Sequence, residues 1–134
     1  GEYKKGDYVT GKNETGAAPE EVAEEMQELL EDLKDVPNEK ALVGAAFFHA
    51  KFENIHPFSD GNGRTGRLML NFNLMRHGLC PVILTKELEE FYHEFIREFD
   101  EFSMARLFKQ QSLQEKVIID ELFKEFKDNK RALK

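Results

Sequence analysis

The sequence contains no tryptophan and a single cysteine among its 134 residues. One cysteine cannot form a disulfide within the chain, so Cys80 provides no internal crosslink. The composition is nevertheless 40% hydrophobic and includes 12 phenylalanines. This combination excludes a disulfide scaffold and argues against a disordered chain. It predicts one compact domain over residues 1–134, stabilised by burial of apolar side chains.

Long apolar runs and an excess of positive charge are also missing. The longest apolar stretch, ALVGAAFF, falls well short of the roughly 18 residues that span a bilayer. A net charge of −7 disfavours nucleic-acid and anionic-membrane partners, because phosphate groups attract clustered Lys and Arg. The N-terminal residues lack the apolar segment of a signal peptide and an initiator Met. We therefore expect a cytoplasmic protein, or a fragment of a longer chain.

Apolar side chains recur at helical spacing along most of the sequence. The pattern predicts helices over residues 19–35 and 38–55, with Asn38 as the cap of the second and Pro57 ending it. A third helix from about residue 62 to Gly78 is apolar nearly all round, so we expect it at the centre. A fourth follows over 88–99, and Ser103 is the expected cap of one or two more.

The N-terminal segment has a different pattern. Tyr8, Val9 and Thr10 favour a strand, and turn-forming residues lie on both sides of them. The expected fold class is therefore an all-α bundle over residues 18–134 with a small β-hairpin within residues 1–17.

Residues 56–67, HPFSDGNGRTGR, concentrate groups that suit a phosphate ligand. Gly61 and Gly63 lie where a loop becomes a helix, and the free N–H groups of a helix start attract anions. Arg64 and Arg67 are one turn apart, so both guanidiniums can reach the same ligand. The chain has no GxxxxGK[ST] motif, so this would be a phosphate site of another kind.

Two further side chains of this stretch suit phosphate chemistry. Asp60 can hold Mg²⁺ together with phosphate oxygens, and His56 can accept a proton near neutral pH. Taken singly, the residues have structural alternatives: turn glycines, an aspartate helix cap, surface arginines and a structural histidine. Their coincidence at one helix start favours a functional site.

The stretch resembles the signature of the Fic-domain family, HxFx[D/E]GNGRxxR. More loosely, the resemblance extends from the N-terminal segment to the helix after Thr85. All eight specified positions match: His56, Phe58, Asp60, Gly61, Asn62, Gly63, Arg64 and Arg67.

The resemblance implies a protein adenylyltransferase, which transfers AMP from ATP to a Ser, Thr or Tyr hydroxyl of a target protein. His56 would be the general base, and Asp60 would hold Mg²⁺ against the α- and β-phosphates. The target would align along the hairpin within residues 1–17, which corresponds to the hairpin called the flap in related proteins.

The resemblance also implies roles for the remaining motif residues. The backbone of Gly61 and Gly63, with Asn62, would form the anion nest. Arg64 would bind the phosphate tail, and Arg67 would contact the terminal phosphate. Phe58 is expected to anchor the loop in the core.

Several alternatives stay open within this interpretation. Related domains transfer UMP, GMP or phosphocholine, and some remove AMP. Alternatively, the domain is a non-catalytic nucleotide-binding module, which keeps the anion-binding nest of residues 61–63 but does not catalyse transfer. No segment fits the inhibitory pattern [S/T]xxxE[G/N], since Thr85 and Glu89 are followed by Glu90. If the domain is restrained at all, the inhibitory helix is therefore expected in an upstream segment or on an antitoxin-like partner.

Overall fold

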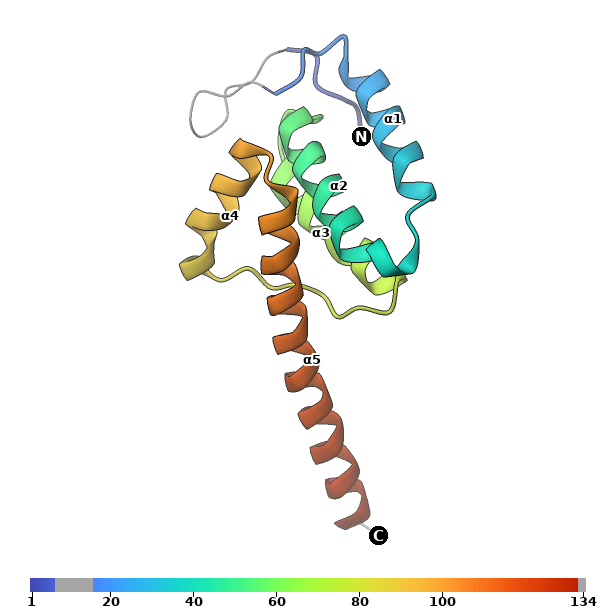
Figure 1. Ribbon diagram of the computed structural model, residues 1–134, viewed down its shortest axis with the longest axis vertical. Coiled ribbons are helices and arrows are strands. Elements are labelled where there is room, and N and C mark those ends of the chain that lie inside the picture. Colours follow the sequence, from blue (N-terminus) through green and yellow to red (C-terminus); the bar gives the residue numbers. More distant parts are fainter. Residues whose placement is uncertain (7–15, 133–134) are drawn as a thin grey trace.

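The computed structural model describes residues 1–6 and 16–132, and these residues contain no strand. The predicted all-helical core is thus confirmed. Its elements, in chain order, are α1 (Val22–Lys34), the short 3₁₀ helix η1 (Asn38–Lys40), α2 (Ala41–Ile55), α3 (Asn62–Arg76), α4 (Lys86–Glu98) and α5 (Glu101–Ala132) (Figure 1). No helix in these two ranges is both long and apolar enough to cross a membrane.

The centre of the bundle is α2, which contacts α1, α3, α4 and α5. Its small buried residues Ala45, Ala46 and Ala50 let neighbouring helices approach closely. The prediction that the third helix would be central is wrong. One side of α3 is open to solvent, because Leu68, Phe72 and Met75 on it are exposed.

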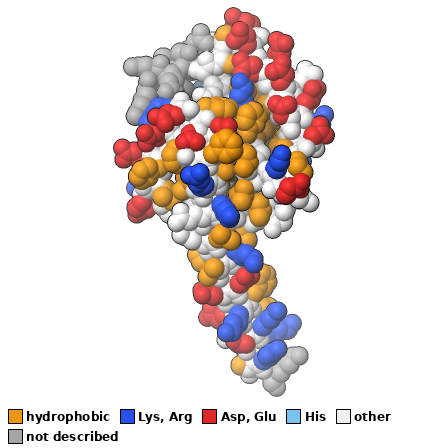
Figure 2. Space-filling view, in the orientation of Figure 1, with side chains coloured by type: hydrophobic (Ala, Val, Ile, Leu, Met, Phe, Trp, Pro, Cys, Tyr) orange, Lys and Arg blue, Asp and Glu red, His pale blue; other side chains and the backbone are white. Residues whose placement is uncertain are grey.

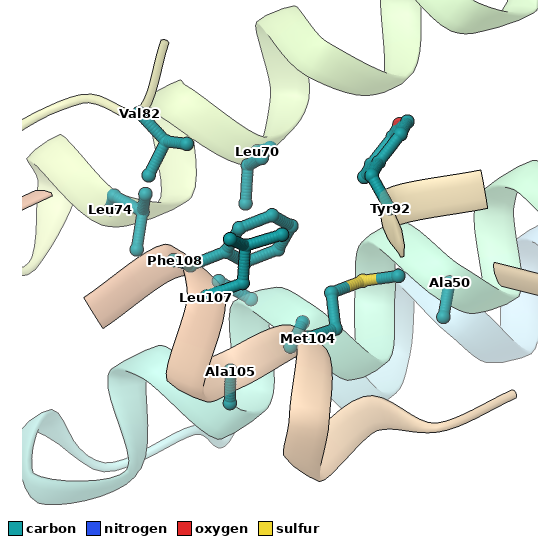
Figure 3. Packing of buried hydrophobic residues seen from close by; sticks show 11 residues of the cluster. Ala50, Leu70, Leu74, Val82, Tyr92, Met104, Ala105, Leu107 and Phe108 are labelled. Atoms are coloured by element: carbon teal, nitrogen blue, oxygen red, sulfur yellow. The ribbon is translucent and has the colours of Figure 1, made fainter. Parts of the chain in front are cut away.

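Two apolar clusters hold the helices together. The larger joins α2 to α3, α4 and α5, and Figure 3 shows Leu70, Leu74, Tyr92, Met104 and Phe108 packed within it. The smaller joins α1 to α2. Phe58 of the motif loop packs against this smaller cluster, as predicted for that side chain. Because the loop is tied to this cluster, the motif is held against the end of α2.

The C-terminal region is one continuous helix rather than two. It begins after Asp100, whose Oδ1 accepts a hydrogen bond of 3.1 Å from the Ser103 N–H. Asp100 therefore caps α5, and the prediction that Ser103 would be the cap is wrong. The expectation that Asn38 caps the second helix is also wrong. Asn38 lies in η1, which precedes α2, and no side chain caps the start of α2.

The second half of α5 projects away from the other helices (Figure 1). In its first half, Met104 and Phe108 are fully buried. On the same face further along, Ile118, Leu122 and Phe126 are exposed. Figure 2 shows apolar side chains among charged ones on the projecting part. The apolar face of α5 thus extends beyond the bundle that covers its beginning.

The predicted hairpin falls mostly on residues 7–15, which lie outside the described residues, so its strand formers are not placed. The ends of the segment are described. The Lys4 N–H donates to the Pro57 carbonyl at 2.9 Å, and the Ala17 N–H donates to the Ile55 carbonyl at 3.0 Å. Both ends therefore attach where α2 passes into the motif loop.

Candidate active site

The end of α2 places the motif histidine. His56 adopts the left-handed conformation, with φ 52° and ψ 62°, and its N–H donates to the Phe52 carbonyl at 3.0 Å. Pro57 cannot continue the helix and keeps the preceding residue out of helical geometry. The predicted helix end is confirmed, and His56 turns out of α2 at the start of the loop.

The loop after His56 is held by a side chain from α3. The Oδ1 atom of Asn62 accepts from the Phe58 N–H at 2.8 Å, and its Nδ2 donates to the Phe58 carbonyl at 2.8 Å. Asn62 is 4% exposed. Its amide is therefore occupied by the loop backbone, and what Asn62 can offer a ligand is its own N–H at the helix start.

Gly61 makes the turn into α3. It adopts φ 79°, a conformation that residues with a side chain rarely take, and it is the N-cap of the helix. No side chain caps this end, so Asp60 is not the helix cap that its position also allowed. The N–H groups of the first turn have no hydrogen-bond partner within the helix. They point out of its N-terminal end, where they can donate hydrogen bonds to an anion.

The candidate active site is a pocket of about 330 Å³ at this helix start. It contains every residue that the sequence singled out as catalytic, phosphate-binding or metal-binding, and it also contains Ser59. The lining residues are His56, Ser59, Asp60, Gly61, Asn62, Gly63, Arg64 and Arg67.

The charged side chains at the rim are exposed. The Asp60 carboxylate is 93% exposed, and its Oδ2 lies 3.7 Å from Arg64 Nη2. An exposed pair of this kind is weak, so either partner can turn to a ligand. The described residues include no group of three or more His, Cys, Asp or Glu side chains suited to a metal. A single carboxylate still fits Mg²⁺, which characteristically takes few protein ligands and binds substrate phosphates and water.

His56 is electrostatically suited to act as a base. Partial burial lowers its pKa below the ordinary value near 6.5, and the positive charge of Lys4 lowers the pKa further. A histidine with a lowered pKa is neutral at neutral pH and can accept a proton. The sequence did not indicate Lys4 as a neighbour of the motif, because the two are far apart along the chain.

Comparison with known proteins decides the family. A family model described as the Fic/DOC family matches residues 1–74, more than half of the chain. The chain belongs to the Fic/DOC family. The match includes α1, α2 and most of α3, and hence the whole Fic motif of residues 56–67.

Named relatives and a solved structure resemble this Fic domain. The protein adenylyltransferase fic-1 of Caenorhabditis briggsae is 42% identical over 81 residues, which are 59% of this chain. The protein adenylyltransferase Fic of Aedes aegypti is 49% identical over 57 residues, 42% of this chain. A Fic family protein from Desulfovibrio desulfuricans G20 superimposes with a TM-score of 0.68 at 29% identity over 89% of this chain.

These matches cover only part of each relative. The chain spans 16% of the Caenorhabditis protein and 11% of the Aedes protein. It spans 41% of the Desulfovibrio chain. The similarity thus concerns the Fic domain itself.

Beneath the pocket, this Fic domain has polar side chains that the sequence pattern did not reveal. His49 and Glu53 come from α2 and Tyr92 from α4, and the charge of Arg67 acts on all three. The sequence pattern places His49 and Tyr92 on apolar helix faces, so no sequence signal distinguished them from core residues, and nothing in the pattern marked Glu53 as buried. Only the packing of α4 against α2 brings Tyr92 to His49.

Proposed function

We propose that this Fic domain is a protein adenylyltransferase that transfers AMP from ATP to a Ser, Thr or Tyr hydroxyl of a target protein. One observation carries the proposal: a neutral histidine, His56, lines the same pocket as the start of α3 and the two motif arginines. A base beside a phosphate site is what transfer to a hydroxyl requires. The names of the relatives support the choice of AMP as the transferred group.

ATP binds through its phosphates in this proposal. The N–H groups of residues 61–63 and the Arg64 guanidinium hold the phosphate tail, and Arg67 contacts the terminal phosphate. Asp60 would hold Mg²⁺ at the pocket rim, where its carboxylate faces solvent. Bound Mg²⁺ supplies positive charge that offsets the negative charge of the phosphates.

The transfer step forms one bond to phosphorus, breaks another and moves one proton. The target hydroxyl oxygen attacks the α-phosphorus of ATP, and His56 takes the hydroxyl proton. The bond from the α-phosphorus to the oxygen bridging the α- and β-phosphates breaks, and pyrophosphate leaves. Arg64 and Arg67 stabilise the charge that moves onto the leaving group. The products are an AMP-modified protein, pyrophosphate and a protonated His56.

Protein partners follow from the family resemblance alone. We expect the target to add an extended segment along the flap within residues 1–17. We also expect that any inhibitory helix would come from an upstream segment or an antitoxin-like partner. If an upstream segment inhibits, its addition should suppress activity through a glutamate that pairs with Arg67. Equal activity with and without that segment would rule it out.

The decisive experiment follows the fate of two phosphates. The domain is incubated with Mg²⁺, a cell lysate and ATP labelled at either the α- or the γ-phosphate. We expect label that depends on His56 to reach protein only from the α-position, measured as the difference between the wild-type and His56→Ala incubations with the same lysate. The matched control is His77→Ala, which removes a histidine at the opposite end of α3. Nucleotide binding by calorimetry should be nearly unchanged in His56→Ala.

Other results would select among the alternatives. If ATP binds but neither label transfers, UTP, GTP and a phosphocholine donor are tested next. Release of AMP from modified protein would indicate the reverse activity. ATP binding with no transfer from any donor would identify a non-catalytic nucleotide-binding module.

A further inference from the structure

An apolar groove lies over α2, between α1 and α5. Both of these helices contact α2, but over their described lengths they do not contact each other, so a strip of α2 is left between them (Figure 1). The groove has a volume of about 290 Å³, and we call it the α2 groove. Its apolar lining includes Leu33 of α1 and Val43 and Phe47 of α2. Val43 is 39% exposed, so the floor of the groove is open to solvent.

Negative charge surrounds the α2 groove. Asp32, Asp35 and Glu101 line it, together with a single base, Lys40. None of the three carboxylates is in an ion pair within the described residues. The α1 wall adds to the negative charge, because α1 contains five acidic residues and one lysine. The groove therefore suits an apolar helix face with basic side chains beside it.

The second half of α5 presents an apolar face of this kind. Ile118, Leu122 and Phe126 are 48%, 59% and 64% exposed. They recur every four residues, and residues four apart lie on one side of a helix, so they form a continuous stripe. We call these three residues the α5 stripe. The stripe has the spacing of an amphipathic helix that binds in a groove.

The charge of the same segment is opposite to that of the groove. Residues 122–132 carry two acidic and four basic side chains, the latter being Lys124, Lys127, Lys130 and Arg131. In the described part of the chain, none of these four bases is in an ion pair. The end of α5 thus combines an apolar stripe with a net positive charge.

The projecting part of α5 needs a partner to cover it. No other helix lies beside this part in Figure 1. Helices in proteins gain most of their stability from packing of an apolar face rather than from the propensity of their residues. Large apolar patches exposed to water are uncommon on monomers and mark interaction sites. The α5 stripe and the α2 groove are both uncovered, and they belong to the same chain.

We propose that two copies of this chain associate by exchanging the second halves of their α5 helices, so that each α5 stripe lies in the α2 groove of the other copy. A two-fold axis gives both copies the same contacts and closes the assembly at two. The negative charge of the groove and the positive charge of the helix end favour a second copy as the occupant. The active-site pocket shares no lining residue with the α2 groove, so the proposal does not depend on the proposed function.

The proposal fixes the relative direction of the two helices. Glu101 is the first residue of α5 and lines the groove, so a helix in the groove lies alongside the first half of α5. Reciprocal exchange therefore makes the two α5 helices antiparallel. The basic last turns of one copy then lie beside Asp100 and Glu101 of the other. A parallel pair would place the two second halves against each other and leave both grooves empty.

Sedimentation equilibrium of the wild-type chain is the first test. We expect a monomer at low micromolar concentration and a dimer as the concentration rises. Leu122→Glu should raise the dissociation constant by about tenfold or more, because a carboxylate would be buried in an acidic groove. The matched control is Val117→Glu, which adds the same charge at a side chain 57% exposed and about 140° away around the helix.

Val117→Glu should leave the association unchanged, and circular dichroism should show that both variants remain helical. A wild-type chain that is monomeric at every concentration would overturn the proposal and leave the groove to a different partner. Equal association of wild type and Leu122→Glu would also overturn it.

A change in the groove tests whether the docking is reciprocal. Val43→Glu should weaken the dimer about as much as Leu122→Glu does. A mixture of these two variants should associate more strongly than either alone, because one of its two dockings then contains both changes and the other contains none. If Val43→Glu has no effect, or if the mixture is no stronger, the α2 groove is not the binding site.

A spin-label distance tests the direction of the helices. The label is attached at Asn129→Cys after Cys80→Ser removes the native thiol, since Asn129 is exposed. Antiparallel exchange should separate the two labels by about 40–50 Å, at 1.5 Å per helical residue. A parallel pair of α5 helices would bring the labels within about 20 Å. The short distance would overturn the exchange.

Discussion

Asn62 binds both backbone groups of Phe58, with 2.8 Å to its N–H and 2.8 Å to its carbonyl. The same arrangement occurs at Asn71, whose side chain bonds the Val82 N–H at 2.8 Å and the Val82 carbonyl at 3.2 Å. Two asparagines of α3 thus each hold a loop. One loop carries the active site, and the other connects α3 to α4.

This pair provides a matched test of the active-site loop. Asn62→Ala and Asn71→Ala should each lower the free energy of unfolding by about 1–3 kcal/mol, because each leaves two backbone groups without a partner. Only Asn62→Ala should also weaken ATP binding, by about tenfold or more, because the phosphate-binding backbone is displaced. Urea denaturation and calorimetry measure the two effects. Equal loss of ATP binding in both variants would contradict a specific role of the Asn62 loop.

The pH dependence of transfer should report the pKa of His56. The base acts when unprotonated, so activity rises as the pH passes its pKa. Burial, and to a smaller extent the charge of Lys4, lowers the pKa of His56. The rise in activity should therefore occur below pH 6.5, the ordinary pKa of histidine. Lys4→Met keeps the backbone bond to Pro57 and removes the charge, so the rise should move to higher pH. Lys5→Met, at a side chain 83% exposed, is the control and should leave it in place. An unshifted profile in Lys4→Met would exclude an effect of Lys4 on the base.

Glu53 should make stability depend on pH. Burial raises its pKa from 4.5 to about 7. Between these values the folded protein binds more protons than the unfolded chain, so the contribution of Glu53 to stability falls as the pH rises. Glu53→Gln removes this decline. The stability of the variant relative to wild type should therefore increase from pH 4.5 to pH 8, by up to about 3 kcal/mol. Denaturation across this range measures it, and a difference that does not vary with pH would contradict the assigned pKa.

His49 acts in the opposite direction on the wild-type curve. Its pKa is lowered to about 4, so the unfolded chain binds the extra proton between pH 4 and 6.5. Its contribution to stability is lost as the pH falls through that window. Both proteins of the Glu53 comparison contain His49, so its effect largely cancels in their difference.

The two halves of α5 should respond differently to truncation of a phenylalanine. Phe108 is 0% exposed, and Phe108→Ala should cost about 3–5 kcal/mol through the lost contacts and the cavity left behind. Phe126 is 64% exposed, and Phe126→Ala should change stability by less than about 0.5 kcal/mol. Urea denaturation of dilute protein compares them. A large loss in Phe126→Ala would mean that the distal face of α5 is covered in solution.

The sequence by itself determined the helices and the local chemistry of the motif. Apolar spacing placed the helices, and Pro57 and Gly61 placed the ends of the loop between α2 and α3. Because residues 56–67 are consecutive, the histidine, acid, glycines and arginines share one helix start whatever the rest of the chain does. These features depend on interactions within a turn or two of the backbone, which a sequence pattern encodes directly.

Only the tertiary structure decided which distant side chains act on the motif. It placed the charge of Lys4 beside His56 and the hydroxyl of Tyr92 within hydrogen-bond distance of His49. It also made α2 the central helix, although α3 looked more apolar all round. Contacts between separate helices depend on how their faces pack, and a buried polar residue within an apolar pattern looks like any other core position until that packing is known.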